Sequence, residues 1–150
     1  MKGFPDPKVE DESPLLTSLS DLEINNYFKN EPRFGGTLSN DQLTKKNYNP
    51  KKAYILNLQN QNQRGSHWVS LLPLGRYIDS YGVGPTQEIT PLVKTYNTSY
   101  FQGFTQSDCG YFAIYHCEQA LKGKDPFQDL KASNYSHNYG VLKRYFTPTK

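Results

Sequence analysis

Short runs of apolar residues separated by polar segments predict three strands in the central part of the chain. Residues 54–58 form a mostly apolar run after two lysines, a pattern typical of a buried strand. Residues 68–72 and 76–81 predict two further strands, and Pro73 and Gly75 between them predict a turn. The last two strands should therefore pair as an antiparallel hairpin.

Apolar positions at helical spacing predict the helices. The strongest pattern covers residues 109–122, where aromatic and aliphatic residues form a broad apolar surface and Gly123 fits a C-terminal cap. A first helix follows either Ser20 or Asp21, both of which are good N-caps. Its apolar residues are Leu22, Ile24, Tyr27 and Phe28.

Four weaker patterns complete the outline. Residues 31–36 predict a turn after the first helix, because they contain a proline and two glycines. Residues 87–96 predict a helix, Asp125 and Pro126 fit the N-cap and first position of another, and residues 138–146 predict a short final helix. The expected fold class is α+β, a small and mainly antiparallel sheet flanked by helices.

Composition indicates one domain with an aromatic core. A chain of 150 residues is long enough to bury a sizeable core. Only 35% of the residues are hydrophobic, but the 12 tyrosines and 8 phenylalanines bury large areas each. Residues 1–17, which contain three prolines and an acidic run, predict a flexible arm, so the domain should span residues 18–150. The net charge of +3 permits weak contact with an acidic partner and does not identify nucleic acid as one.

The two cysteines are typical of a reducing, intracellular environment. Cys109 and Cys117 are eight residues apart, which is about 12 Å along a helix and too far for a disulfide within it. We therefore expect both thiols to be reduced. The polar, proline-rich start of the chain does not resemble a signal peptide, and we expect neither secretion by that route nor a membrane span.

Four side chains supply the groups that thiol-based acyl transfer needs. Cys109 begins the predicted 109–122 helix, where the helix dipole favours an anion. His67 begins a predicted strand, and Asp79 follows it by twelve residues on the other arm of the hairpin, a spacing that can bring them together. Gln102 or Gln106 could donate an amide N–H to the oxyanion, and their chemistry alone does not choose between them.

Each of these residues also has a structural interpretation. Cys109 could be a core cysteine, Asp79 a strand-end residue and either glutamine a loop residue. The presence of all four groups in one chain favours a catalytic role in acyl transfer over these structural roles. His116, inside the long helix, and His137, in a polar segment, are more typical of packing and surface positions. The chain has no Cys-x-x-Cys motif and no histidine pair at ligand spacing, so we expect no metal site.

Three stretches in this order resemble the adenovirus-type maturation proteases (adenain-like), whose wider clan includes the SUMO-deconjugating proteases. They are Gly-Ser-His-Trp-Val at residues 65–69, Tyr-Ile-Asp-Ser-Tyr-Gly at 77–82, and Gln-Gly at 102–103 followed by Cys-Gly-Tyr-Phe at 109–112. Weaker similarity to the proteases of virophages and Polinton-type elements extends the match to about residues 19–146.

The resemblance implies a role for each matched residue. Cys109 would be the nucleophile at the N-terminus of a central helix, His67 the base, Asp79 its orienting carboxylate and Gln102 the oxyanion donor. Gln102 lies seven residues before the cysteine, as in the adenovirus-type pattern, whereas deconjugating proteases usually have it six before. Residues expected to contact substrate are Trp68, Gly103, Asp108 and Gly110.

The resemblance also implies a function: a monomeric cysteine endopeptidase that cleaves capsid or core precursors at glycine-containing sites during virion maturation. Its location would be the virion and the infected cell. No cofactor is required by the sequence. An activating peptide and DNA are candidates from the adenovirus enzyme, but Cys117, the one spare cysteine, does not match the position that holds that peptide.

Three alternatives follow from the same residues. The first is a deconjugating protease acting on ubiquitin-like modifiers. The second is a binding module on a protease fold, which the full set of four groups disfavours. The third is a chymotrypsin-like viral cysteine protease, which shares the order His, acid, Cys but should be all-β, against the strong helix predicted after Cys109.

Overall fold

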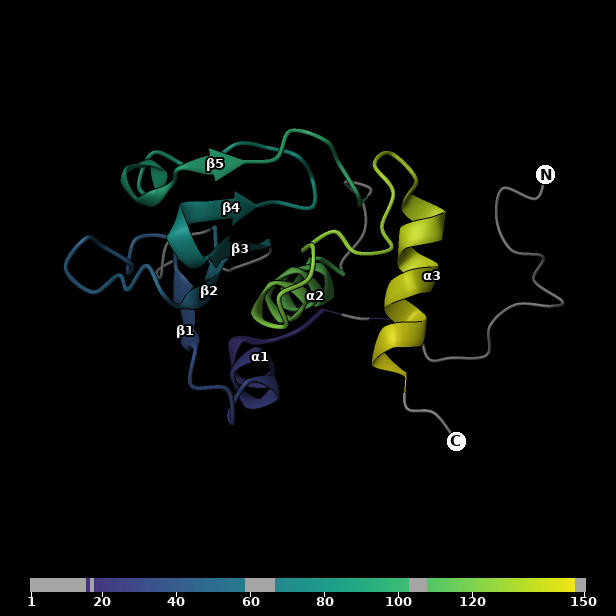
Figure 1. Ribbon diagram of the computed structural model, residues 1–150, viewed down its shortest axis with the longest axis horizontal. Helices are drawn as coiled ribbons and strands as arrows, with labels where there is room; N and C mark the ends of the chain where they lie inside the picture. The colour runs from purple at the N-terminus through teal and green to yellow at the C-terminus, as the bar shows by residue number, and fades with distance from the viewer. Residues whose placement is uncertain (1–15, 17, 59–66, 103–107, 148–150) are drawn as a thin grey trace, which may run out of the picture.

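The computed structural model describes residue 16 and residues 18–58, 67–102 and 108–147. Over these residues the chain forms one five-stranded sheet and three α-helices (Figure 1). The elements in chain order are α1 (Asp21–Tyr27), β1 (Phe34–Ser39), β2 (Ala53–Asn57), β3 (Trp68–Leu72), β4 (Arg76–Ile78), β5 (Thr95–Tyr96), α2 (Cys109–Leu121) and α3 (Tyr135–Phe146). The α+β class predicted from the sequence is confirmed.

The sheet is mixed rather than mainly antiparallel, which corrects one prediction. Its strands lie in chain order from β1 to β5. The β2–β3 and β3–β4 pairs are antiparallel, as expected, but β1–β2 and β4–β5 are parallel. The reason lies in the connections: residues 40–52 and residues 79–94 carry the chain back across the sheet instead of turning as hairpins.

Two segments were assigned wrongly from the sequence. Residues 34–36 belong to β1 rather than to a turn, because Gly35 lies flat against the ring of Tyr54, where a Cβ atom would be 2.2 Å from Tyr54 Cε2. Residues 87–96 are not a helix: they form a 3₁₀ turn at residues 90–92 and then β5. Pro91 cannot donate a backbone hydrogen bond, and Lys94 N–H instead bonds the carbonyl of Gly75 at 2.8 Å.

The helix predictions are otherwise close. Ser20, not Asp21, caps α1: its side chain accepts from Glu23 N–H while the Glu23 carboxylate accepts from Ser20 N–H, forming a capping box. α2 covers the expected residues to within one position. α3 begins three residues earlier than predicted, after Asn134. The helix expected at Asp125 is only a turn, in which the Asp125 carboxylate accepts from Phe127 N–H.

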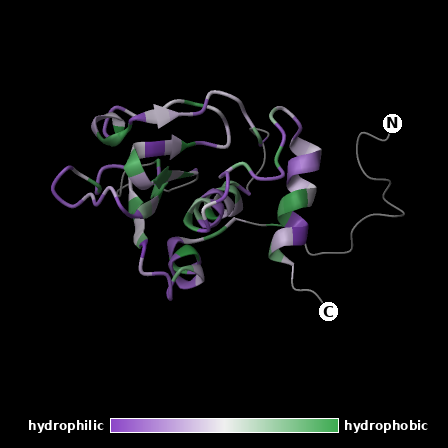
Figure 2. Ribbon diagram, in the orientation of Figure 1, coloured by the Kyte–Doolittle hydropathy of each residue, from purple (hydrophilic) through white to green (hydrophobic). Residues whose placement is uncertain are grey.

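The sheet is buried on both faces, and alternate residues of its strands face opposite sides. One face packs on α1 and α2 and the other is covered by residues that connect the strands. The first face carries Ala53, Ile55, Trp68, Leu72 and Ile78; the second carries Tyr54, Leu56, Val69, Leu71 and Tyr77. Apolar colouring accordingly appears on the inner strands and on parts of α2, whereas β5 is pale (Figure 2).

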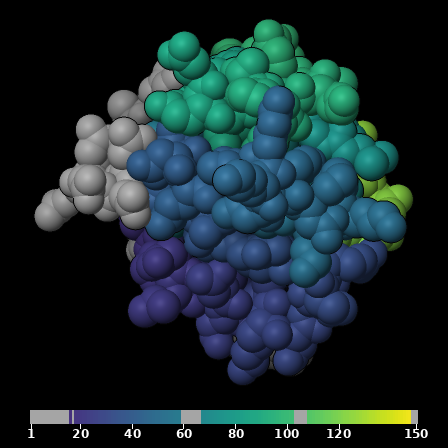
Figure 3. Space-filling view, turned by 90° about the vertical axis from the view of Figure 1, so that its left-hand side faces the viewer, coloured from purple at the N-terminus to yellow at the C-terminus, as the bar shows by residue number. Residues whose placement is uncertain are grey.

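α2 is the central helix of the molecule. It lies between the sheet and α3, with α1 beneath it in the view of Figure 1. The end of the molecule away from α3 is built by α1, the β1–β2 connection and the segment around β5, which follow one another across the surface (Figure 3). The buried hydroxyl of Ser70 on β3 donates to the carbonyl of Ala113 on α2 at 2.9 Å. This bond fixes the position of α2 against β3, the strand that directly follows His67.

No helix in the described part of the chain is both long and apolar enough to cross a membrane.

Candidate active site

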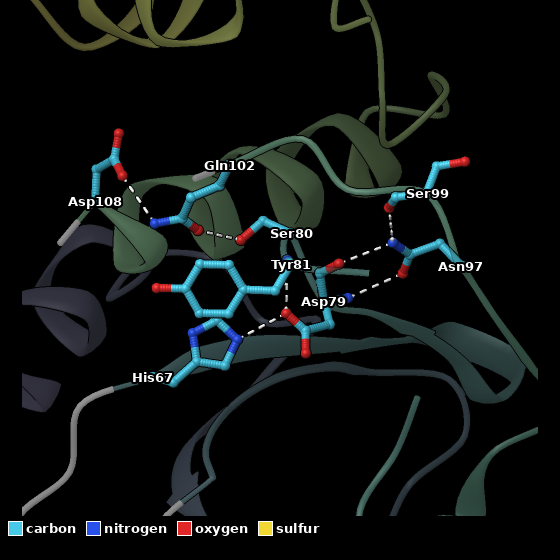
Figure 4. Close-up of polar contacts among 8 residues, drawn as sticks. All are labelled: His67, Asp79, Ser80, Tyr81, Asn97, Ser99, Gln102 and Asp108. Atoms are coloured by element: carbon cyan, nitrogen blue, oxygen red, sulfur yellow. Dashed lines mark hydrogen bonds and ion pairs between the residues drawn. The ribbon is translucent and has the colours of Figure 1, made fainter. Parts of the chain in front are cut away.

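The ends of β3 and β4 bring His67 and Asp79 together. His67 immediately precedes β3 and Asp79 immediately follows β4. Because these strands are antiparallel, with Ser70 opposite Ile78, His67 and Asp79 lie at the same end of the β3–β4 pair. His67 Nε2 is 2.7 Å from Asp79 Oδ1, so the contact expected from the twelve-residue spacing is present (Figure 4).

Asp79 is held from several directions. Its side chain is buried, and Oδ1 also accepts from the backbone N–H of Tyr81 at 2.8 Å. The side chain of Asn97 brackets its backbone: Oδ1 accepts from Asp79 N–H at 2.9 Å, and Nδ2 donates to the Asp79 carbonyl at 2.8 Å. The carboxylate therefore has little freedom to turn away from His67.

The surroundings of His67 favour its charged form. Burial alone would lower the pKa of this imidazole, but hydrogen bonds to Asp79 and Cys109, together with the negative charges of those groups, raise it to about 9. The ring of Tyr81 stacks on the imidazole, with centroids 4.1 Å apart and planes 13° from parallel. The stacking and the bond to Asp79 fix the ring plane.

Cys109 is the first residue of α2 and is buried at the junction with the sheet. Asp79 contacts Nε2 of His67, which leaves Nδ1 as the ring nitrogen for a second partner. The Cys109 thiol lies close enough to His67 for its hydrogen bond and its charge to raise the pKa of the imidazole.

Gln102 lies beside these groups and is fully buried. Its Nε2 donates to Asp108 Oδ1 at 2.8 Å, and its Oε1 accepts a short hydrogen bond from the hydroxyl of Ser80. Its backbone N–H donates to the carbonyl of Ser80 at 3.2 Å. A neutral amide donor therefore lies in the same cluster as His67 and Asp79 (Figure 4), and it is bonded to Asp108, the residue before Cys109.

Compared with models of protein families and with curated proteins, the chain matches none.

The remaining predicted site residues divide into three groups. Gly103 and the rival donor Gln106 lie outside the described residues. Trp68 packs closely on Gly110, the residue after Cys109, where an added Cβ would lie 3.3 Å from Trp68 Cδ1, and the Trp68 indole N–H donates to the carbonyl of Leu19 at 3.2 Å. Asp108 is 1% exposed, with its carboxylate toward Gln102. Substrate contact by these residues stays a prediction.

The other histidine and cysteine of α2, His116 and Cys117, are both buried. His116 is buried, its pKa is lowered to about 4 by burial, and its Nδ1 contacts the carbonyl of Pro126 at 2.9 Å. Burial raises the pKa of the Cys117 thiol to about 12. Within the described residues no group of three or more histidine, cysteine or acidic side chains is placed to hold a metal ion.

Sequence reasoning missed the residues that support the site. Asn97 stands in the polar run Asn-Thr-Ser at 97–99, which reads as an ordinary loop. Ser80 and Tyr81 lie inside the quoted Tyr-Ile-Asp-Ser-Tyr-Gly motif, so that motif was the available signal, but nothing in it tells which neighbours they contact. Their partners lie 14 to 22 residues away along the chain or across a strand pair.

Proposed function

We propose that this protein is a cysteine endopeptidase in which Cys109 is the nucleophile, His67 the general acid and base, and Asp79 the group that orients His67. The observation that carries the proposal is the His67–Asp79 bond, which lies at the end of the β3–β4 pair beside Cys109, the first residue of α2. A buried imidazole with a raised pKa, next to a thiol at a helix N-terminus, favours the thiolate–imidazolium pair.

In this mechanism the Cys109 thiolate attacks the carbonyl carbon of the scissile peptide bond, and the carbonyl oxygen becomes an oxyanion. Gln102 Nε2 and the backbone N–H of Cys109 donate hydrogen bonds to it. His67 gives its proton to the leaving amine as the C–N bond breaks, leaving a thioester on Cys109. Water then attacks the thioester, His67 accepts its proton, and the carboxylic product leaves the free thiolate.

We further propose that the substrates are viral capsid or core precursors cut at glycine-containing sites. This step rests on the resemblance of the three motifs to the adenovirus-type proteases and on the position of Gln102 seven residues before Cys109. The proposed setting is the maturing virion in an infected cell, with protein precursors as partners.

The first test is the rate at which iodoacetamide alkylates Cys109 as a function of pH, followed by mass spectrometry. We expect alkylation well below the free-thiol pKa of about 8.5, and loss of that reactivity in His67→Ala. His137→Ala is the matched control, because His137 lies on α3 and bonds the carbonyl of Asp129 instead. Alkylation of Cys109 only above about pH 8.5 in the wild type would contradict the proposal.

The second test is cleavage of quenched fluorescent peptides with glycine on both sides of the scissile bond. Cys109→Ala should abolish cleavage. Gln102→Ala should lower kcat by about 100-fold, while Gln106→Ala should not. An equal loss in Gln106→Ala alone would move the oxyanion role to that residue. Cleavage after the Gly-Gly tail of a ubiquitin-like modifier, without cleavage of capsid precursors, would instead identify a deconjugating protease.

A further inference from the structure

Asp108 occupies the N-cap position of α2 but does not cap the helix. An aspartate at this position usually accepts a hydrogen bond from a backbone N–H of the first turn. Here the side chain makes no capping bond, and Oδ1 accepts from Gln102 Nε2 at 2.8 Å instead. The carboxylate at the start of the nucleophile helix is thus directed away from the helix and onto the amide of Gln102.

The other end of that amide is fixed as well. The hydroxyl of Ser80 donates to Gln102 Oε1. A donor can bond only to the oxygen of an amide group, because the amide nitrogen is itself a donor. Asp108, which accepts, satisfies only the nitrogen end. Figure 4 shows the two residues on opposite sides of the Gln102 side chain. Together they define which way the amide points.

We propose that Asp108 and Ser80 are positioning residues, which hold Gln102 so that its Nε2 stays directed to the oxyanion formed at Cys109. This inference rests on the proposed protease function and assigns to Asp108 a role different from the substrate contact predicted from the sequence.

Backbone hydrogen bonds and chain connectivity link these two residues to the rest of the site. Ser80 follows Asp79 directly, and its carbonyl accepts from the backbone N–H groups of Phe101 and Gln102 at 2.7 and 3.2 Å. Asp108 precedes Cys109 directly. The orienting carboxylate, the oxyanion donor and the nucleophile are therefore tied to one another through adjacent backbone positions, and a shift of the amide would require one of these elements to move.

Asp108 is also costly to bury, which argues against a role as simple filler. Its side chain is 1% exposed, and burial raises its pKa to about 6, although hydrogen bonds from its own backbone N–H, from Gln102 and from Tyr135 act to lower it. Tyr135 is the first residue of α3. A charged acceptor binds an amide more strongly than a neutral one. The carboxylate therefore restrains Gln102 more firmly than an asparagine would.

The test compares Asp108→Ala, Asp108→Asn and Ser80→Ala with the wild type, using the glycine-containing quenched peptides and iodoacetamide. Alkylation forms no oxyanion, so it reports the thiolate alone. We expect Asp108→Ala to lower kcat about tenfold with little change in KM and in the alkylation rate of Cys109. Asp108→Asn should fall between Ala and wild type, and Ser80→Ala should also lower kcat. Asp125→Asn, an exposed carboxylate beyond the other end of α2, is the matched control.

A double-mutant cycle decides whether the loss passes through Gln102. In a Gln102→Ala background, Asp108→Ala should change kcat by no more than about twofold. A full additional loss there, a wild-type kcat in Asp108→Ala, or a parallel fall in the alkylation rate would overturn the assignment. If Asp108→Ala does not fold, as judged by circular dichroism, Asp108→Asn and Ser80→Ala supply the same cycle. A wild type that cleaves none of the peptides would instead overturn the proposed function and this inference with it.

Discussion

Replacing Asp79 by Asn should move the basic limb of the pH–rate profile and leave the acidic side little changed. In the native protein the His67 pKa is about 9, and the Asp79 carboxylate is one of the two groups that raise it. The asparagine is nearly the same size, so the perturbation removes a charge from a buried hydrogen bond without opening a cavity. Burial, which lowers the pKa, would then act against the remaining effect of Cys109, and His67 is expected to titrate near its ordinary value of about 6.5.

The magnitude follows from the two pKa values. At about pH 7.5 an imidazole with a pKa of 9 is about 97% protonated, and one with a pKa of 6.5 is about 9% protonated. The population of imidazolium falls about tenfold, equivalent to about 1.4 kcal/mol, before any loss of ring orientation is counted. At about pH 5.5 both forms are mostly protonated, and this part of the effect should nearly vanish.

Two assays check this. The first is kcat/KM for peptide cleavage between about pH 5 and 10. The second is NMR titration of the three histidines, in which the signal of His116 is set apart because burial lowers its pKa to about 4. A basic limb that stays near pH 9 in Asp79→Asn, with cleavage at about pH 7.5 within about twofold of wild type, would refute the reasoning.

The other predictions concern stability and reactivity. The folded-state pKa of Asp108 is raised from 3.8 to about 6, so the folded state loses stability as pH rises through that window. Asp108→Asn removes this loss and should therefore stabilise the protein by up to about 3 kcal/mol at about pH 8 and by much less at about pH 4. Urea unfolding that shows equal gains at both pH values would contradict this. Gly82 has φ +76°, and a Cβ there would be 2.8 Å from the carbonyl oxygen of Thr98, so Gly82→Ala should cost about 1–3 kcal/mol in a thermal melt, whereas an unchanged Tm would argue against this loop geometry. Cys117, whose pKa burial raises to about 12, should resist iodoacetamide until the chain unfolds, and labelling of Cys117 at the rate of Cys109 in folded protein would show that α2 opens.

The sequence predicted the parts of the fold whose signals are local. The hairpin of β3 and β4 has a proline–glycine turn between two apolar runs, and α2 has an apolar surface followed by a glycine. β1 was missed because its two glycines read as a turn, and only the ring of Tyr54, which lies nearly twenty residues later, shows why a glycine fits a strand there. Residues 87–96 have helical spacing, but pairing of β5 with β4 and the proline at residue 91 decide otherwise.

The same division holds for the site. His67 and Asp79 were paired correctly because strand pairing converts a twelve-residue spacing into contact. The hydrogen bonds of Asn97 to Asp79 and of Ser80 to Gln102 join residues 18 and 22 positions apart. They depend on how the loops fold at the end of the β3–β4 pair, and no local sequence pattern predicts that arrangement. Asp108 shows the limit most clearly, because the resemblance implies only substrate contact for it, whereas its carboxylate accepts a hydrogen bond from Gln102, six residues earlier in the chain.

The packing of Trp68 makes it an intrinsic fluorescence probe of the region around Cys109. Trp68 is the single tryptophan of the chain, it is 9% exposed, and a Cβ added to Gly110, the residue after Cys109, would lie only 3.3 Å from its Cδ1 atom. Fluorescence excited at the red edge of the indole band therefore comes from this one side chain near the Cys109 thiol, without a contribution from the tyrosines. Its indole N–H bond to the carbonyl of Leu19 also couples that emission to the segment leading into α1. Stopped-flow fluorescence could thus follow changes around Cys109 in unlabelled protein, with no dye attached and no cysteine consumed.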